Sequence, residues 1–257
     1  MQAWAILAPM SHTASTTIDP AEIANFTAIA EDWWEPEGRL KPLHDLNPLR
    51  IAYIRDTICQ RLGRSPLAPK PLQGLRIADI GCGGGILTEP LARLGASVVG
   101  VDPGTENIAV AARHAAEGDL EIDYRIGTAE ALVLSGERFD AVVAMELVEH
   151  VADVNVFLEA LAGLLRPEGI LFMSTLNRTP KSFALAIVGA EYILGWVPRG
   201  THDWRKFLRP SELAAGLRRH GVTLRDTTGI VYGPLSQSFR LDKRNLAVNY
   251  MLWGKRG

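Results

Sequence analysis

The feature that most constrains this chain is an apolar run followed at once by a glycine-rich turn. Residues 76–80 read Arg-Ile-Ala-Asp-Ile, as in a short buried strand, and Gly81, Gly83 and Gly85 come directly after it. Residues 86–94 then place apolar side chains at the spacing of a helix. A strand, a tight glycine turn and a helix together form the nucleotide-binding corner of an α/β sheet. Glycine suits this corner because it lacks a Cβ, so the backbone can approach a ligand closely.

The register of the glycines narrows the choice of ligand. The dinucleotide fingerprint G-x-G-x-x-G requires glycine at position 86, where this chain has Ile86. Instead, Asp79 stands two residues before a G-x-G-x-G pattern, which is similar to the first motif of class I methyltransferases that use S-adenosylmethionine (SAM). Asp102 ends the next apolar run, where a carboxylate can accept hydrogen bonds from both ribose hydroxyls. The pattern therefore favours SAM over a nicotinamide dinucleotide.

Strands and helices alternate from residue 76 onward, which predicts a doubly wound, mostly parallel α/β sheet of seven strands. The last two apolar runs, 222–228 and 245–253, have no helix between them, so we expect them to form an antiparallel hairpin at one edge. Three segments follow from this reading. They are a disordered extension at 1–18, a helical lid at 19–72 and a main domain at 73–257 that carries an insertion at 176–210.

The composition of the chain indicates which partners and which cellular location to expect. A chain of 257 residues can bury the core of one α/β domain. The net charge of −2 does not indicate a nucleic-acid partner, and two cysteines are too few for a disulfide framework. We find neither a signal peptide nor an apolar run of the ~20 residues that a membrane span needs. A cytoplasmic location is therefore expected.

A charged group follows the fourth predicted strand, where carboxyl ends of strands line the ligand crevice. Glu146, Glu149 and His150 stand at i, i+3 and i+4, so a helical turn would place all three on one face. Together they could bind a divalent ion such as Mg²⁺, which would lower the pKa of a phenolic acceptor. Alternatively, His150 could act alone as a general base. A purely structural role at a helix N-terminus is the third reading, and all three stay open here.

The insertion contains an apolar stretch, 183–197, of 15 residues with one charge. It is too short to span a membrane, but it contains Tyr and Trp and basic residues follow it. This composition suits an interfacial segment on anionic lipid. A buried helix that roofs the substrate pocket explains it equally well.

Nearly the whole chain from about residue 20 resembles the bacterial ubiquinone biosynthesis O-methyltransferases. The similar motifs are at 33–34, 41–44, 47–50, 79–87, 145–150, 174–178, 188–194, 200–203 and 248–251. The resemblance implies SAM contacts at Arg50, Gly81, Asp102 and Met145. It also implies that Glu146, Glu149 and His150 match a metal-binding set described in eukaryotic relatives.

The rest of the cofactor site is predicted from the residues around these contacts. Asp79 and Gly83 belong to the same turn, and Ala129 and Glu130 lie in a loop after the third predicted strand that can reach the adenine. The activity that the resemblance implies is methyl transfer to phenolic hydroxyls of a polyprenylated catechol and of 3-demethylubiquinol. It further implies peripheral contact with the inner membrane and a possible complex with other enzymes of quinone biosynthesis. Methylation of another small acceptor, or SAM binding without turnover, are the rival functions.

Overall fold

The computed structural model describes residues 17, 20–184, 203–234 and 236–257. Two helices and a 3-10 turn come first: α1 (Pro20–Thr27), η1 (Ala30–Trp34) and α2 (Lys41–Leu62). The helix α2 begins at Lys41, with Pro42 in its first turn. Proline is tolerated there because the first N–H groups of a helix have no intrahelical acceptor.

The other elements alternate as predicted over most of the chain. They are β1 (Arg76–Ile80), α3 (Thr88–Arg93), β2 (Ser97–Asp102), α4 (Thr105–Glu117), β3 (Asp123–Ile126), α5 (Ala129–Leu134), β4 (Phe139–Met145), α6 (Val154–Leu164), β5 (Leu165–Leu176), α7 (Pro180–Ser182), η3 (Trp204–Lys206), α8 (Pro210–Arg219), β6 (Val222–Gly233), β7 (Ser238–Asp242) and β8 (Asn249–Arg256).

One sheet runs through the molecule in the order β3-β2-β1-β4-β5-β8-β6-β7. The strands from β3 to β5 are parallel, and β8 pairs antiparallel with both β5 and β6. The predicted α/β class is confirmed, and β6 and β8 pair antiparallel as expected. They do not form the predicted hairpin, because β7 lies between them in the chain and makes the hairpin with β6. The predicted count of seven strands is also wrong. The sheet has eight strands because the short segment β7 folds back on β6 as an edge hairpin.

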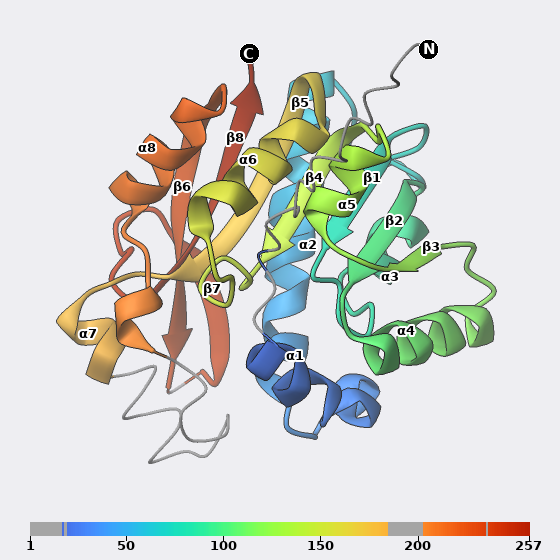
Figure 1. Cartoon of the computed structure of the whole chain (residues 1–257), viewed down its shortest axis with the longest axis horizontal. Coiled ribbons are helices and arrows are strands. Elements are labelled where there is room, and N and C mark those ends of the chain that lie inside the picture. Colours follow the sequence, from blue (N-terminus) through green and yellow to red (C-terminus); the bar gives the residue numbers. More distant parts are fainter. Residues whose placement is uncertain (1–16, 18–19, 185–202, 235) are drawn as a thin grey trace, which may run out of the picture.

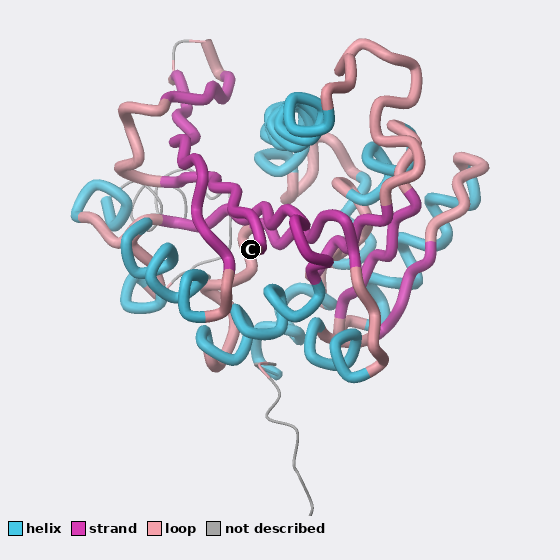
Figure 2. The backbone as a smooth tube through the Cα atoms, turned by 90° about the horizontal axis from the view of Figure 1, so that it is seen from above, coloured by secondary structure: helices cyan, strands magenta, loops and turns pink. Residues whose placement is uncertain are grey.

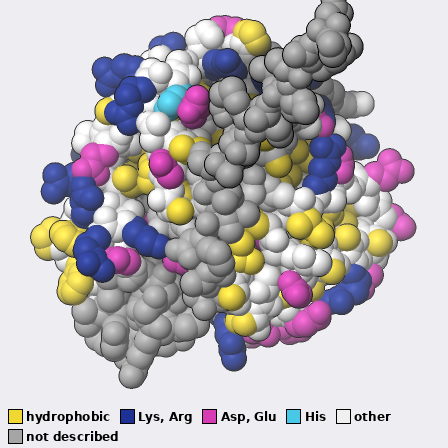
Figure 3. Space-filling view, in the orientation of Figure 1, with side chains coloured by type: hydrophobic (Ala, Val, Ile, Leu, Met, Phe, Trp, Pro, Cys, Tyr) yellow, Lys and Arg dark blue, Asp and Glu magenta, His cyan; other side chains and the backbone are white. Residues whose placement is uncertain are grey.

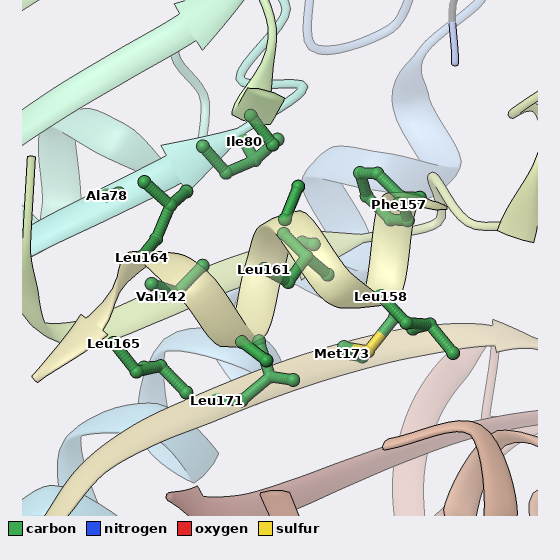
Figure 4. Close-up of a cluster of buried hydrophobic side chains, with 14 of the residues drawn as sticks. Ala78, Ile80, Val142, Phe157, Leu158, Leu161, Leu164, Leu165, Leu171 and Met173 are labelled. Carbon is green, nitrogen blue, oxygen red and sulfur yellow. The ribbon is translucent and has the colours of Figure 1, made fainter. Parts of the chain in front are cut away.

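Helices cover both faces of this sheet (Figure 2). On one face, side chains of α2 and α3 pack with β1, β2 and β4, around Ile54, Leu91 and Val143. On the other face, α5, α6 and α8 form the larger cluster. Figure 4 shows α6 in this second cluster, with Leu161 and Leu164 directed at the strands that carry Val142 and Leu171. Side chains of this kind each contribute roughly 1.5–3 kcal/mol when fully buried, so this packing fixes the strand ends that form the site.

Some of the predictions concern residues that the structure does not describe. The expected disordered extension, residue 17 apart, and most of the apolar stretch 183–197 lie there, and the division into lid and main domain stays a prediction. Among the described residues, no helix is both long and apolar enough to cross a bilayer. Figure 3 shows Lys and Arg side chains lying among Asp and Glu side chains on one face, in keeping with the small net charge.

Candidate active site

One cavity of about 730 Å³ lies at the carboxyl ends of the parallel strands, where α1 also lies (Figure 1). Its size is that of a site for a small molecule or cofactor. Every residue that the sequence predicted for the site lines this cavity. These residues are Arg50, Asp79, Gly81, Gly83, Asp102, Ala129, Glu130, Met145, Glu146, Glu149 and His150.

The glycine turn has the backbone that its sequence predicts. Gly81, Gly83 and Gly85 have φ values of 70°, 53° and 88°, in the left-handed region that favours glycine. A Cβ on Gly83 would lie 2.3 Å from the indole ring of Trp33. The Nε1 of Trp33 donates to Asn107 Oδ1 at 2.9 Å, so the indole is held flat against the turn. Trp33 thus packs the N-terminal helices onto this corner.

Asp102 joins the tip of β2 to the glycine turn. Its Oδ2 accepts from the backbone N–H of Gly83 at 3.1 Å, and its Oδ1 accepts from Gly104 N–H at 2.8 Å and Asn107 Nδ2 at 3.0 Å. Burial raises the pKa of Asp102, and these donors oppose that rise by favouring the carboxylate. The two oxygens lie at the wall of the cavity, where a ribose would meet them.

Asp79 lies deeper in the same corner and is 3 % exposed. Its Oδ2 accepts from the hydroxyl of Thr88 at 2.7 Å, which ties the end of β1 to the start of α3. Burial raises the pKa of Asp79 to about 7, although Thr88 and the charge of Arg50 act against that rise. Asp79 therefore ties the glycine turn to α3, and it is one of the polar residues that line the cavity.

Arg50 projects from α2 into the cavity and is 6 % exposed. Its Nη2 lies 3.2 Å from Glu146 Oε1, whereas its Nε has no hydrogen-bond partner among the described residues. A buried guanidinium N–H without a partner is costly, and a bound carboxylate would satisfy it. The methionyl carboxylate of SAM is such a group.

Ala129 and Glu130 also line the cavity, and they begin α5 instead of lying in a loop as we predicted. The helix starts there because the side chain of Thr128 caps it, accepting from Ala131 N–H at 3.3 Å. Glu130 Oε1 accepts from the hydroxyl of Thr17 at 2.6 Å. Its Oε2 is buried without a partner among the described residues, so it can accept from the amino group of an adenine.

The carboxylate of Glu146 is enclosed by donors. Ser174 Oγ donates to it at 2.6 Å, and Asn249 Nδ2 lies 3.1 Å from each of its oxygens, in addition to Arg50. Glu146 has a φ of 49°, so the predicted helical turn from Glu146 to His150 is wrong. A backbone in this region costs of order 1–3 kcal/mol in a residue other than glycine, and the donors hold Glu146 there.

Glu149 and His150, the other two residues of the predicted metal site, contact different partners. Glu149 is 4 % exposed, and its Oε2 accepts from Thr175 Oγ1 at 2.8 Å. His150 Nδ1 lies 3.1 Å from Glu22 Oε2, a contact with α1 that sequence reasoning missed. Burial acts to lower the pKa of His150, but Glu22 and the charge of Glu149 outweigh it, so the pKa is raised. An imidazole in this setting binds a proton more strongly than an ordinary histidine does.

The predicted metal site does not fit this arrangement. Within the described part of the chain, no group of three His, Cys, Asp or Glu side chains is placed to hold a metal ion. Glu146 already receives three donors, one of them the guanidinium of Arg50, whose positive charge would repel a cation. The carboxylate of Glu149 already accepts a hydrogen bond from the hydroxyl of Thr175. We therefore derive no step of the reaction from a metal.

Chelation tests this correction directly. Treatment of the enzyme with EDTA, followed by gel filtration, is expected to leave the rate of methyl transfer unchanged within about twofold, because His150 can act as a base without a metal. Added Mg²⁺ is expected to have no further effect. Loss of turnover in EDTA that Mg²⁺ restores would show that Glu146, Glu149 and His150 rearrange to bind an ion.

Comparison with known proteins identifies the family. A family model described as "Methyltransferase domain" matches residues 78–173. The ubiquinone biosynthesis O-methyltransferase of Brucella anthropi is 53 % identical over 247 residues, covering 96 % of this chain and 99 % of that protein. The chain belongs to the ubiquinone biosynthesis O-methyltransferase family. A second member, from Methylobacterium nodulans, is 54 % identical with the same coverage.

Solved structures of more distant proteins agree on the fold. The magnesium protoporphyrin IX methyltransferase of Synechocystis, solved with bound SAM, aligns with a TM-score of 0.58 at 19 % identity, over 95 % of this chain and all of that one. A possible histamine N-methyltransferase from Thermotoga maritima aligns at 0.59 and 17 % identity, over 91 % of this chain and 99 % of that one. Family membership and fold confirm the predicted enzyme class, a methyltransferase that uses SAM.

Proposed function

We propose that this family member methylates phenolic hydroxyls of polyprenylated catechols and of 3-demethylubiquinol in ubiquinone biosynthesis. One observation carries the proposal. The cavity that contains the nucleotide corner around Asp102 is also lined by Glu146 and by His150, whose side chain is 10 % exposed. The donor and a ring hydroxyl can therefore meet within one enclosed space. The names of the relatives support a quinone-type acceptor.

Different residues bind different parts of the SAM molecule. Asp102 accepts from the ribose hydroxyls, Glu130 and Ala129 face the adenine, and Met145 packs beside it. Gly81 and Gly83 leave room for the methionyl part, whose carboxylate is bound by Arg50. Glu146 fixes the direction of Arg50 and is a positioning residue.

SAM supplies a methyl group bonded to a positively charged sulfur. Transfer is an in-line displacement in which the bond from acceptor oxygen to carbon forms as the bond from carbon to sulfur breaks. A phenol has a pKa of ~10, by analogy with tyrosine, so at neutral pH it needs a base. His150 takes the hydroxyl proton, and Glu22 and Glu149 stabilise the imidazolium that results.

The acceptor class is tested by turnover with labelled SAM. We expect the enzyme to transfer label to a catechol that carries a short prenyl chain, and to transfer none to an amine of similar size. Transfer to the amine would favour a methyltransferase for another small acceptor. Binding of SAM without transfer in a single turnover would indicate a scaffold.

We further infer that the chain acts at the cytoplasmic face of the inner membrane, where such acceptors reside, in a complex with other enzymes of the pathway. Phe183, at the start of the apolar stretch, is 47 % exposed, and its ring meets Trp204 edge to face at 6.4 Å. Aromatic side chains of this kind favour a membrane interface. Co-sedimentation with anionic vesicles tests this, and a protein that stays in the supernatant would refute it.

A further inference from the structure

An apolar strip leads away from the reaction centre along the edge hairpin. β6 and β8 pair Ile230 with Asn249, the residue whose amide donates to Glu146. Side chains two residues apart on a strand share a face, so Tyr232 lies on the same side of β6 as Ile230. Phe239 of β7 is directly opposite Tyr232, with ring centroids 5.1 Å apart. We call Ile230, Tyr232 and Phe239 the hairpin strip.

The helix α2 forms the wall opposite this strip. Leu46 of α2 and Ile230 are both buried in one small cluster, against which Phe239 and Leu241 pack. Leu43 and Leu46 from α2, together with the hairpin strip, line the same cavity as Asp102 and Glu146. The cavity thus has a polar end at the parallel strands and an apolar end between α2 and the hairpin.

The donor and the aromatic ring do not account for this apolar end. Arg50, Asp79 and Asp102 form the polar end, which suits the charged methionyl group and the ribose. The side chains of Leu46, Ile230 and Phe239 offer hydrogen-bonding groups neither to SAM nor to ring hydroxyls, and they favour an extended hydrocarbon. Tyr232 adds the apolar face of its ring to this surface. Pro234 also lines the cavity at the far end of the strip. From Ile230 to Pro234 a strand rises roughly 13 Å.

We propose that the space between α2 and the hairpin strip binds the polyprenyl chain of the acceptor. This inference rests on the proposed function, which supplies the class of substrate. The ring lies beside Asn249 and His150, and the chain runs past Ile230 toward Tyr232 and Pro234. One five-carbon unit extends about 5 Å when its carbon–carbon bonds are about 1.5 Å long. The strip therefore contacts the first two or three units, about 10–15 Å of chain, and the remainder lies beyond it.

The strip is tested by comparing two acceptors, a catechol without a chain and a catechol with a three-unit chain. We expect Phe239→Ala to lower the preference for the prenylated acceptor, measured as a ratio of kcat/KM values, by about tenfold through KM, because several buried CH₂ contacts are lost. Leu241→Ala is the matched control, since Leu241 is on the same strand and packs on the same cluster but does not line the cavity. This variant is expected to keep the ratio within about twofold of the wild type.

Two further measurements distinguish the loss of a chain-binding contact from the loss of folding. Thermal unfolding and SAM affinity show whether each variant folds, and Tyr232→Ala replaces Phe239→Ala if the latter does not. An unchanged ratio in the strip variants, or an equal change in the control, overturns the inference while leaving the proposed function intact. If the wild type methylates neither catechol, the proposed function fails, and the chain site fails with it.

Discussion

Replacing His150 with glutamine is expected to lower kcat by about 10²–10⁴-fold while leaving the affinity for SAM unchanged. Glutamine keeps a polar side chain of similar reach, but it cannot accept a proton at neutral pH. The side chain of His150 is only 10 % exposed and lies beside Glu22 and Glu149, so bulk water has little access to the acceptor proton that His150 removes. Steady-state kinetics with a catechol acceptor and calorimetry with SAM measure the two quantities separately.

The pH dependence of kcat shows whether His150 acts as a base or only packs within the site. Without a base, the rate depends on the fraction of acceptor that is already ionised, so the variant should gain about tenfold per pH unit up to the phenol pKa of ~10. His220→Gln is the matched control, because His220 is a half-buried histidine at the C-terminal end of α8 and does not line the cavity. A kcat for His150→Gln within a few-fold of the wild type, or a flat profile, would remove His150 as the base.

Asp102→Ala is expected to weaken SAM binding by about 2–3 kcal/mol, the value of a pair of hydrogen bonds to a charged group. This corresponds to a dissociation constant roughly 30- to 150-fold higher. The loss has two sources. The ribose hydroxyls lose their acceptor, and the glycine turn loses the bond from Gly83 N–H to Asp102 Oδ2.

A neighbouring aspartate provides the control for this substitution. Asp123 begins β3 beside β2, but it is exposed, pairs with Arg125 and does not line the cavity. Asp123→Ala should therefore bind SAM as the wild type does. Unchanged affinity in Asp102→Ala, with the same thermal unfolding as the wild type, would exclude Asp102 from the donor site.

Most of the parallel half of the fold was predictable because its signals are local. The glycine turn at 81–85 and the alternation of apolar runs with helical spacing fix the order of elements from β1 to β5. The edge strand β7 was missed because it has only two apolar residues, Phe239 and Leu241, between exposed polar ones. The start of α2 is hard to predict locally because Pro42 and Pro48 are typical of breaks, whereas one lies in the first turn and the other is accommodated within the helix.

The site was predictable as a set of residues but not as a set of contacts. Spacing placed Glu146, Glu149 and His150 near each other, yet it could not show that each has its own partner. Glu146 takes a left-handed backbone and receives Asn249 from a strand 103 positions away. Glu22 reaches His150 from α1 across a similar gap in sequence. Long-range contacts of this kind leave no periodic signal, because the sheet order that creates them is set by the whole chain.

The central claim is that one cavity brings the SAM sulfur and an acceptor oxygen together beside His150. A crystal structure with S-adenosylhomocysteine and a prenylated catechol tests it most directly. We predict ribose hydroxyls on Asp102, the amino-acid carboxylate on Arg50, and a ring oxygen in hydrogen-bonding contact with the imidazole of His150. A nucleoside bound away from the glycine turn, or a ring oxygen remote from His150, would contradict the account.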